Sequence, residues 1–528
     1  MTGGFTAPHI DWAQLAPIII VLGAGVLGVL VEAFAPRAVR RTVQLTLALV
    51  ASAGALIVVA VLWAGIGKSG GTEVLGGSVL IDGPALVVQG IVVALTLLAL
   101  LVVADRTETG EDAFAPSASA VPGSDYEQQA LKARLVQTEV FPLILFAAGG
   151  MMIFPAAGDL LTMFVALEVL SLPLYLLSGL ARRRRLLSQE AAMKYFLLGA
   201  FASALFLFGV ALLYGFAGSV RLKDIAAATG TVVGMDGLLL AGLALVLVGL
   251  LFKIGAVPFH SWTPDVYQGA PTPITGFMAA CTKAAAFGAL LRIVYVIVPA
   301  VVWDLRPALW TVVILTMAVG TFVALVQTDV KRILAYSAIA HTGFILTGVV
   351  ALDKSGVTAV LFYLLAYGIA SIGVFAIVTL VREVGPDGVV LGEATHLSQW
   401  TGLGKKHPWL AVTFSLFLMS FAGIPLTAGF IGKFTAFSAA VQGGATPLAV
   451  AGVVASAIAV FFYVRIIVLM FFTDPPLAGE HVGAEVTVVK SQGLTTVAIA
   501  IAAALTILLG VLPSPVLDLM GQAARFIP

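Results

Sequence analysis

The sequence predicts an all-α integral membrane protein of about fourteen transmembrane helices, with two inverted five-helix repeats and two discontinuous helices. Hydrophobic residues make up 60% of the 528-residue chain, and charged residues make up 10%. Soluble domains carry about 25% charged residues. The apolar residues gather in runs of about 20, the length that crosses a bilayer as a helix. A net charge of +1 leaves no large basic face for nucleic acid.

Apolar runs give the predicted spans. Their boundaries are 14–34, 42–65, 82–103, 139–156, 159–180, 190–216, 238–257, 272–297, 308–326, 331–350, 356–381, 409–437, 447–472 and 493–512. The chain then divides into an N-terminal three-helix segment (1–104), a polar insert (105–138), a first five-helix repeat (139–298), a second five-helix repeat (299–472) and a C-terminal loop with the last helix (473–528). We predict that the insert is a mobile surface loop without chemistry.

The positions of lysine and arginine predict the orientation. Most loop cations lie on the side facing away from the N-terminus, including the run Arg182–Arg185. Cytoplasmic loops are enriched in these residues. We therefore expect a multi-pass protein of the bacterial cell membrane with both termini on the outer side. Because the first apolar run lacks a preceding basic segment, it is expected to be an uncleaved span.

Spans four to eight and nine to thirteen form two sets of five that start on opposite sides of the membrane. A helix in each set is interrupted beside a lysine. Lys253 precedes Pro258 in LLFKIGAVPFHSW, and Lys433 follows Pro425 in GIPLTAGFIGKF. Inverted repeats with paired interrupted helices are typical of ion-coupled transport proteins, whose sites lie at the breaks. The repeat is inferred from helix pattern and not from residue-by-residue similarity.

Ionisable residues within the predicted spans are the candidate functional residues. A charge at the bilayer centre costs about 2.5–3.5 kcal/mol on insertion scales, so such residues usually mark function. The candidates are Glu168, Lys194, Lys253, Lys283, His341 and Lys433. Lysine and histidine can exchange protons near neutral pH when buried, whereas arginine stays charged. We therefore predict a proton relay along these residues, with Glu168 paired to Lys194.

Each kind of candidate has a structural alternative. Glu168 can be a protonated acid bonded to a neighbouring helix, Lys194 can extend to the cytoplasmic interface, and His341 can join helices by hydrogen bonds. The polar bend at 260–267 is expected first as a fold-stabilising cap and second as a site of proton uptake. Arg292 is expected to pair with a neighbour in a structural role.

The cysteine and histidine content bears on cofactors. The single cysteine, Cys281, lies inside a predicted span. One thiol cannot form an intrachain disulfide or a cysteine-ligated iron–sulfur cluster. The six histidines show no paired spacing for a bis-histidyl haem. We therefore expect no cofactor in this chain.

At these residues the sequence closely resembles the antiporter-like membrane subunits of proton-pumping NADH:quinone oxidoreductase, respiratory complex I. The resemblance extends from about Val140 to Met470, and its motifs are EAAMKYFLLGAFASALFLFGVALLYG, LLFKIGAVPFHSWTPDVYQGAPTPITGF, YSAIAHTGF and GIPLTAGFIGKF. Lysine at Lys433 separates the chain from a branch of the family that has glutamate there. The absence of a long C-terminal extension separates it from a branch with a lateral helix.

The resemblance implies a central hydrophilic axis and a proton-translocating subunit driven by quinone reduction in other subunits. By position in the motifs, it implies that Glu168 and Lys194 form a modulating pair and that Lys253 and Lys283 form an inner relay. It also implies that His341 is a connector and that Lys433 is a terminal site toward a neighbouring subunit. Flavin, iron–sulfur clusters and quinone are expected in partner subunits. The expected partners are membrane and peripheral subunits of complex I, especially neighbouring antiporter-like subunits, and the lipid bilayer. The chain would act as an enzyme only within that translocase.

Two other functions remain open. A subunit of a multisubunit Na⁺/H⁺ antiporter would have nearly the same helix plan, and copurification with flavin- and iron–sulfur-bearing subunits would decide against it. A purely structural membrane spacer would translocate nothing. In that case, replacing Lys283 by alanine would leave NADH oxidation and pumping unchanged.

Overall fold

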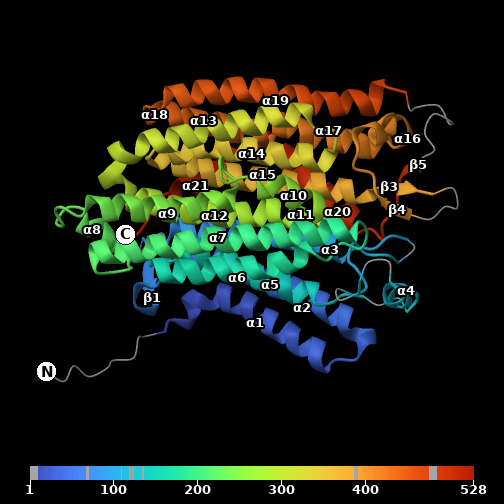
Figure 1. The fold of residues 1–528 in the computed structure, drawn as a ribbon, viewed down its shortest axis with the longest axis horizontal. Helices are drawn as coiled ribbons and strands as arrows, with labels where there is room; N and C mark the ends of the chain where they lie inside the picture. Colours follow the sequence, from blue (N-terminus) through green and yellow to red (C-terminus); the bar gives the residue numbers. More distant parts are fainter. Residues whose placement is uncertain are drawn as a thin grey trace.

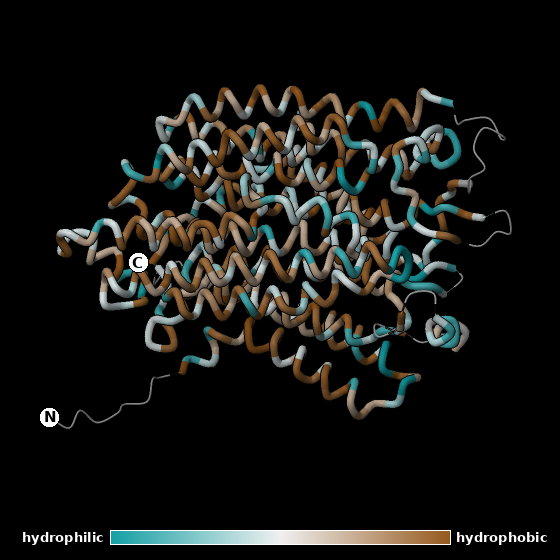
Figure 2. Tube along the Cα trace, in the orientation of Figure 1, coloured by the Kyte–Doolittle hydropathy of each residue, from teal (hydrophilic) through white to brown (hydrophobic). Residues whose placement is uncertain are grey.

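The computed structural model describes residues 10–66, 70–108, 110–117, 120–121, 124–133, 136–385, 390–474 and 485–527. Its helices run side by side along one direction, and short strands and loops lie at the two ends of the bundle (Figure 1). Among the residues described, eleven helices are long and apolar enough to cross a membrane. Figure 2 shows apolar residues along the helices and hydrophilic residues gathered mostly at the ends. This distribution is the one expected of a bilayer-spanning bundle.

The N-terminal segment contains α1 (Trp12–Phe34), α2 (Arg37–Ile66) and α3 (Gly83–Ala104). Helices α1 and α2 expose many apolar side chains, whereas nearly all of α3 is buried. Asp82 caps α3 by accepting a hydrogen bond from the Ala85 backbone N–H at 3.0 Å. The first N–H groups of a helix have no acceptor within it, so Pro84, which has no backbone N–H, suits the first turn. The segment thus supplies one helix, α3, to the interior of the bundle.

The segment predicted as the first repeat contains α5 (Val140–Ile153), η2 (Phe154–Ala156), α6 (Leu160–Ser178), α7 (Arg185–Ala217), α8 (Leu222–Ala228), α9 (Asp236–Ile254), α10 (Trp262–Gly269), α11 (Thr272–Phe277), η3 (Met278–Thr282) and α12 (Lys283–Val296). The turn η4 (Val298–Val301) crosses into the segment predicted as the second repeat, which contains α13 (Val302–Val326), α14 (Val330–Val349), α15 (Lys354–Leu380), α16 (Leu403–Lys406), α17 (Pro408–Ala422), α18 (Ala428–Gln442) and α19 (Thr446–Phe472). Helices α20 (Leu494–Val511) and α21 (Ser514–Ala523) follow. Each predicted span coincides with a helix or a broken pair of helices, so the predicted fold class is confirmed.

Two small sheets mark the ends of the bundle (Figure 1). Strands β1 (Thr72–Val74) and β2 (Val79–Ile81) pair antiparallel at one end. At the other, β3 (Val381–Val384) lies between β4 (Val390–Glu393) and β5 (Glu485–Val488). We call these the β1–β2 end and the β3–β5 end. Both the start of α1 and the end of α21 lie toward the β1–β2 end (Figure 1), which agrees with an even number of spans.

The polar insert differs from its prediction. Phe114 is buried and forms a β-bridge with Ala181. Asp112 pairs with Arg182 at 2.7 Å, and Thr107 bridges to Ser491. The prediction of a mobile surface loop is therefore wrong for these parts of the insert, because an aromatic anchor and an ion pair fix them on the β3–β5 end. Helix α4 (Asp125–Lys132) lies at the same end.

Arg292 forms the most deeply buried ion pair of the residues described. Its guanidinium contacts both carboxylate oxygens of Asp82, at 2.8 and 3.0 Å, and both side chains are 0% exposed. Arg292 also donates to the Pro155 carbonyl at 2.6 Å and lies over the ring of Phe526. The Ile527 backbone N–H donates to Asp82 at 3.1 Å. The pair joins α3, η2, α12 and the C-terminal segment, which is the structural role predicted for Arg292.

Candidate functional site

Lys253 lies in the last turn of α9, where the first discontinuous helix breaks. Gly255 ends the helix at φ 74°, a left-handed conformation that glycine adopts without strain. The buried Lys253 ammonium donates to the Ser171 hydroxyl at 2.7 Å and to the Tyr195 hydroxyl at 3.2 Å. Trp262 stacks on Tyr195 and donates to a carbonyl in the last turn of α9. Trp262 therefore stabilises the break, which supports the predicted capping role of the bend.

Lys283 lies at the start of α12, directly after the π-helical turn η3. Its buried ammonium donates to the Ala338 carbonyl at 2.6 Å and to the Thr342 hydroxyl at 2.8 Å. Thr342 in turn donates to the Ile254 carbonyl at 2.9 Å. One hydroxyl therefore links Lys283 to the open end of α9, one residue beyond Lys253. A π-turn is rare in helices and is found frequently at functional sites.

His341 lies in the middle of α14 and is fully enclosed. Its Nδ1 lies 2.9 Å from the Tyr363 hydroxyl and its Nε2 lies 3.2 Å from the Tyr463 hydroxyl. The Tyr463 hydroxyl also lies 2.5 Å from the hydroxyl of Ser337. Both ring nitrogens thus have a partner that can donate or accept a proton.

Lys433 lies in α18 beside the second break. Its ammonium donates to the Ala422 carbonyl at 2.9 Å and to the Ser456 hydroxyl at 2.7 Å. Ala422 is the last residue of α17, whose C-terminal dipole favours a positive charge. Gly423 follows at φ 83°, and a Cβ there would meet the Lys433 side chain at 2.9 Å. The break therefore supplies both the carbonyl and the space that Lys433 occupies.

The three lysines at 253, 283 and 433 share one setting. Each is buried and donates to neutral oxygens, and none has a carboxylate within 4.0 Å among the residues described. A buried charge without a counter-ion is costly. No permanent partner therefore fixes these amines in the charged form, which is the condition for passing a proton on.

Aromatic rings separate His341 from the lysines on either side. The Tyr367 ring lies 5.1 Å from the Lys283 ammonium and 5.0 Å from the His341 ring. The Phe344 ring lies 4.8 Å from the Lys433 ammonium and 5.6 Å from the His341 ring. The histidine is close enough to both lysines for their charges to act on it. The structure thus brings Lys283, His341 and Lys433 into one buried row.

Glu168 and Lys194 do not form the predicted ion pair. Lys194 instead binds Glu190 at 2.7 Å and Asp265 at 2.8 Å, with 43% of its side chain exposed. Glu168 is half-buried in α6, acts electrostatically on Lys253, and has one carboxylate oxygen without a hydrogen-bond partner among the residues described. The sequence did not indicate this arrangement, because Asp265 comes from the bend, which packs on α7 only in the folded chain.

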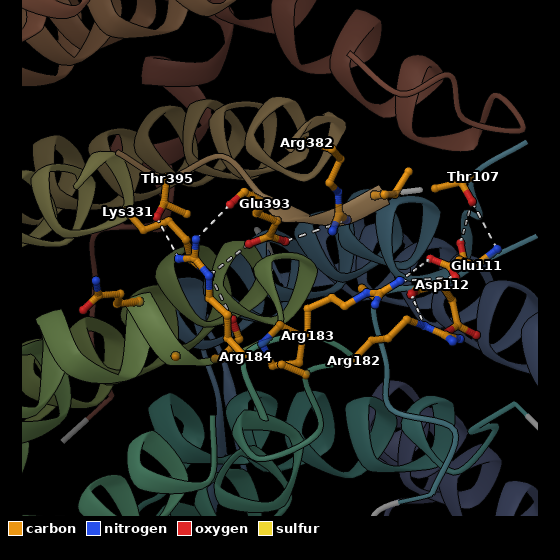
Figure 3. A pocket seen from close by; sticks show the side chains of 17 residues that line it. Thr107, Glu111, Asp112, Arg182, Arg183, Arg184, Lys331, Arg382, Glu393 and Thr395 are labelled. Atoms are coloured by element: carbon orange, nitrogen blue, oxygen red, sulfur yellow. Dashed lines mark hydrogen bonds and ion pairs between the residues drawn. The ribbon is translucent and has the colours of Figure 1, made fainter. Parts of the chain in front are cut away.

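A charged cavity opens at the β3–β5 end (Figure 3). It has a volume of about 40 Å³ and is lined by the run at 182–184, by residues 268–271 at the end of α10 and directly after it, and by residues of β3 and β4. Lys331, at the start of α14, donates there to the Ala270 carbonyl at 3.0 Å and the Thr272 hydroxyl at 2.9 Å. Glu393 lies 3.4 Å from the Lys331 ammonium and 3.8 Å from Arg382. Sequence reasoning missed Lys331 because it looks like a loop cation, although it shares a helix with His341.

The Lys331–Glu393 contact predicts a pH-dependent stability. Burial raises the pKa of the Glu393 carboxyl, but Lys331 and Arg382 lower it further, so that it lies below its ordinary value of 4.5. The folded state then binds fewer protons than the unfolded state, and Glu393 stabilises the fold above pH 4.5, an advantage that disappears as pH falls through the lower folded pKa. Glu393→Gln should cost about 3 kcal/mol near neutral pH, and the difference from wild type should shrink in acid.

Thermal unfolding of the purified protein at neutral and acidic pH measures this difference. Glu111→Gln is the matched control, because the ion pair of Glu111 with Arg183 at 3.5 Å is partly exposed to solvent. Surface pairs contribute about 0–1 kcal/mol. A Glu393→Gln protein that melts like wild type at neutral pH would contradict the prediction.

The fold and the buried row define a class: a multi-pass membrane protein of the ion-translocating type, with interrupted helices and interior titratable residues. Residues 157–459 match the family described as NADH:quinone oxidoreductase/Mrp antiporter, TM. The chain is 65% identical to NADH-quinone oxidoreductase subunit N of Beutenbergia cavernae, over 99% of both chains. It belongs to this family, in its subunit N branch.

Solved structures agree with this assignment. A chain of respiratory complex I from Thermus thermophilus with bound aureothin is 32% identical, with a TM-score of 0.75, over 96% of this chain and all of that one. A chain of the Mrp complex from Dietzia sp. DQ12-45-1b is 25% identical, with a TM-score of 0.77, over 97% and 96% of the two chains. The Mrp-type antiporter subunit therefore shares the fold with this chain. The higher sequence identity, 32% against 25%, favours complex I.

Proposed function

We propose that this chain is a proton-translocating membrane subunit of NADH:quinone oxidoreductase. The relay that we propose contains Glu168, Lys194, Lys253, Lys283, His341 and Lys433. The observation that carries this proposal is that the buried amines of Lys253, Lys283 and Lys433 donate, among the residues described, only to hydroxyls and backbone carbonyls. Such groups can change charge without breaking an ion pair.

The contacts suggest the order of transfer through the interior. Thr342 connects Lys283 with the end of α9 beside Lys253. Tyr463 and Tyr363 give His341 two hydroxyl partners. Lys194 lies at the outer surface of α7, where Asp265 and Glu190 hold it. We assign Lys194 to coupling with Lys253 through the neighbouring residue Tyr195 rather than through Glu168.

The energy must come from partner subunits. Moving one charge across 100 mV takes about 2.3 kcal/mol, and we propose that quinone reduction in other subunits supplies it. Those subunits would hold the flavin, iron–sulfur clusters and quinone. We place the β3–β5 end in the cytoplasm, because the basic residues 182–185 lie there, and both termini on the outer side of the bacterial membrane.

The connector role of His341 gives a first test. Tyr463→Phe keeps the ring but removes the hydroxyl that contacts His341 and Ser337. Leaving a buried hydrogen-bonding nitrogen without its partner costs about 1–3 kcal/mol. We expect NADH-driven proton pumping, measured by dye quenching in vesicles that contain the assembled complex, to fall on the order of tenfold.

Tyr295→Phe is the matched control. Tyr295 loses the same hydroxyl, which donates to the Asp353 carbonyl at 3.1 Å near the β1–β2 end. Pumping in this variant should stay near that of wild type. Equal pumping in the two variants would remove the support for His341 as a connector.

The antiporter alternative has its own experiment. Affinity purification of the chain from its native membrane should recover subunits with flavin and iron–sulfur absorbance. Recovery of only small membrane subunits, with sodium-dependent proton exchange, would favour the Mrp-type function instead.

A further inference from the structure

An apolar crevice opens near the β1–β2 end, away from the buried row. It has a volume of about 100 Å³ and is lined by the end of α12, by η4, by the first turns of α13, by the loop at 350–352 and by Gly443. A much smaller apolar space of about 10 Å³ adjoins it. The two share Val294, Leu309 and Val350, and the second reaches Leu251. The apolar lining therefore continues from the crevice toward Leu251.

Arg306 is the charged side chain of this lining among the residues described. Its guanidinium donates to the Gly444 carbonyl at 3.2 Å and lies 4.8 Å from the centre of the Trp310 ring. No carboxylate lies within 4.0 Å of it in the part of the chain that the structure describes. The crevice mouth therefore carries one positive charge that no ion pair neutralises.

Aromatic side chains place the mouth at membrane-interface depth. Trp303, one turn before Arg306, is 82% exposed, and Trp310 follows one turn later. Tryptophan is enriched at the level of lipid headgroups. An arginine at this depth lies where a phosphate group would lie, and the crevice beneath it lies where an acyl chain would lie.

We propose that this crevice binds an anionic phospholipid, with its phosphate on Arg306 and one acyl chain between α12, α13 and α14. The unneutralised guanidinium selects an anionic headgroup, with which it can form paired hydrogen bonds. The apolar lining selects a hydrocarbon chain and gives no hydrogen-bond partner for a wholly polar anion. The site therefore selects a molecule that has both an anionic headgroup and a hydrocarbon chain.

Photo-crosslinking of the assembled complex tests the proposal. The probe is phosphatidylglycerol with a diazirine in one acyl chain, and the matched probe is phosphatidylcholine with the same chain. We expect the first probe to label peptides that contain Val294, Leu309 or Val350, and unlabelled phosphatidylglycerol to compete. Arg306→Gln should reduce labelling about fivefold, because the guanidinium that pairs with the phosphate is lost, and Arg306→Lys should retain most of it.

Lys354→Gln is the control, because Lys354 is an exposed cation near the same end that does not line the crevice. Its labelling should equal that of wild type. Equal labelling by the two probes in the wild-type complex would overturn the proposal, and this arm decides the matter even if Arg306→Gln fails to assemble. Competition by added quinone, but not by phosphatidylglycerol, would also overturn it in favour of a quinone occupant.

Discussion

Lys283→Ala is expected to lower both proton pumping and NADH oxidation on the order of tenfold while the complex still assembles. A positioned proton-transfer group typically contributes about 10²–10⁴-fold, and we expect less here because water can replace part of the lost amine. The reason lies in its contacts: the Lys283 ammonium joins the Ala338 carbonyl to Thr342, and Thr342 joins it to α9. Pumping and NADH oxidation are measured on the same vesicles, and assembly on native gels.

Lys283→Arg separates titration from packing. Arginine keeps the positive charge but does not release its proton at physiological pH. We therefore expect Lys283→Arg to pump poorly as well. If Lys283 had a purely electrostatic or packing role, the arginine variant would instead pump like wild type. Lys354→Ala, at an exposed lysine outside the row, should behave like wild type. Undiminished pumping and NADH oxidation in Lys283→Ala would favour the structural spacer.

The spans and both breaks could be predicted because each depends on its own short stretch of sequence. A run of about 20 apolar residues crosses a bilayer wherever its neighbours are. Gly423 and Pro425 interrupt a helix by their own backbone properties. The turn η3 before Lys283 gave no such signal, because no glycine or proline marks residues 278–282.

The partners of the ionisable residues could not be predicted, because they depend on packing between distant segments. Lys194 binds Asp265, which is 71 residues away in the chain. Lys331 is buried because Glu393, from the strand β4, covers it. The residues next to each lysine in the sequence do not indicate either contact. The sequence therefore predicted the kinds of ionisable residue that lie inside the bundle, but not the hydrogen-bond and ion-pair partners of those residues.

Arg292→Met is expected to cost about 3–5 kcal/mol of stability, the usual cost of breaking a fully buried pair. It leaves the Asp82 carboxylate without its cation, and the remaining partners in the part of the chain that the structure describes are the backbone N–H groups of Ala85 and Ile527. The amount of complex recovered after solubilisation and its melting temperature should both fall. Arg465→Met is the control, since Arg465 is partly buried and donates to the Leu325 carbonyl at 3.2 Å, so it should cost only about 1 kcal/mol.

The double variant Asp82→Asn with Arg292→Met identifies the source of that loss. Asparagine still caps α3 through Ala85 but no longer buries a charge, so the double variant should be more stable than the sum of the single changes predicts. An additive result would mean that lost packing, and not the stranded carboxylate, is responsible. Pumping per assembled complex should stay normal in Arg292→Met, because Arg292 lies outside the buried row and cannot release its proton. Reduced pumping in fully assembled Arg292→Met complex would instead place this pair within the transport pathway.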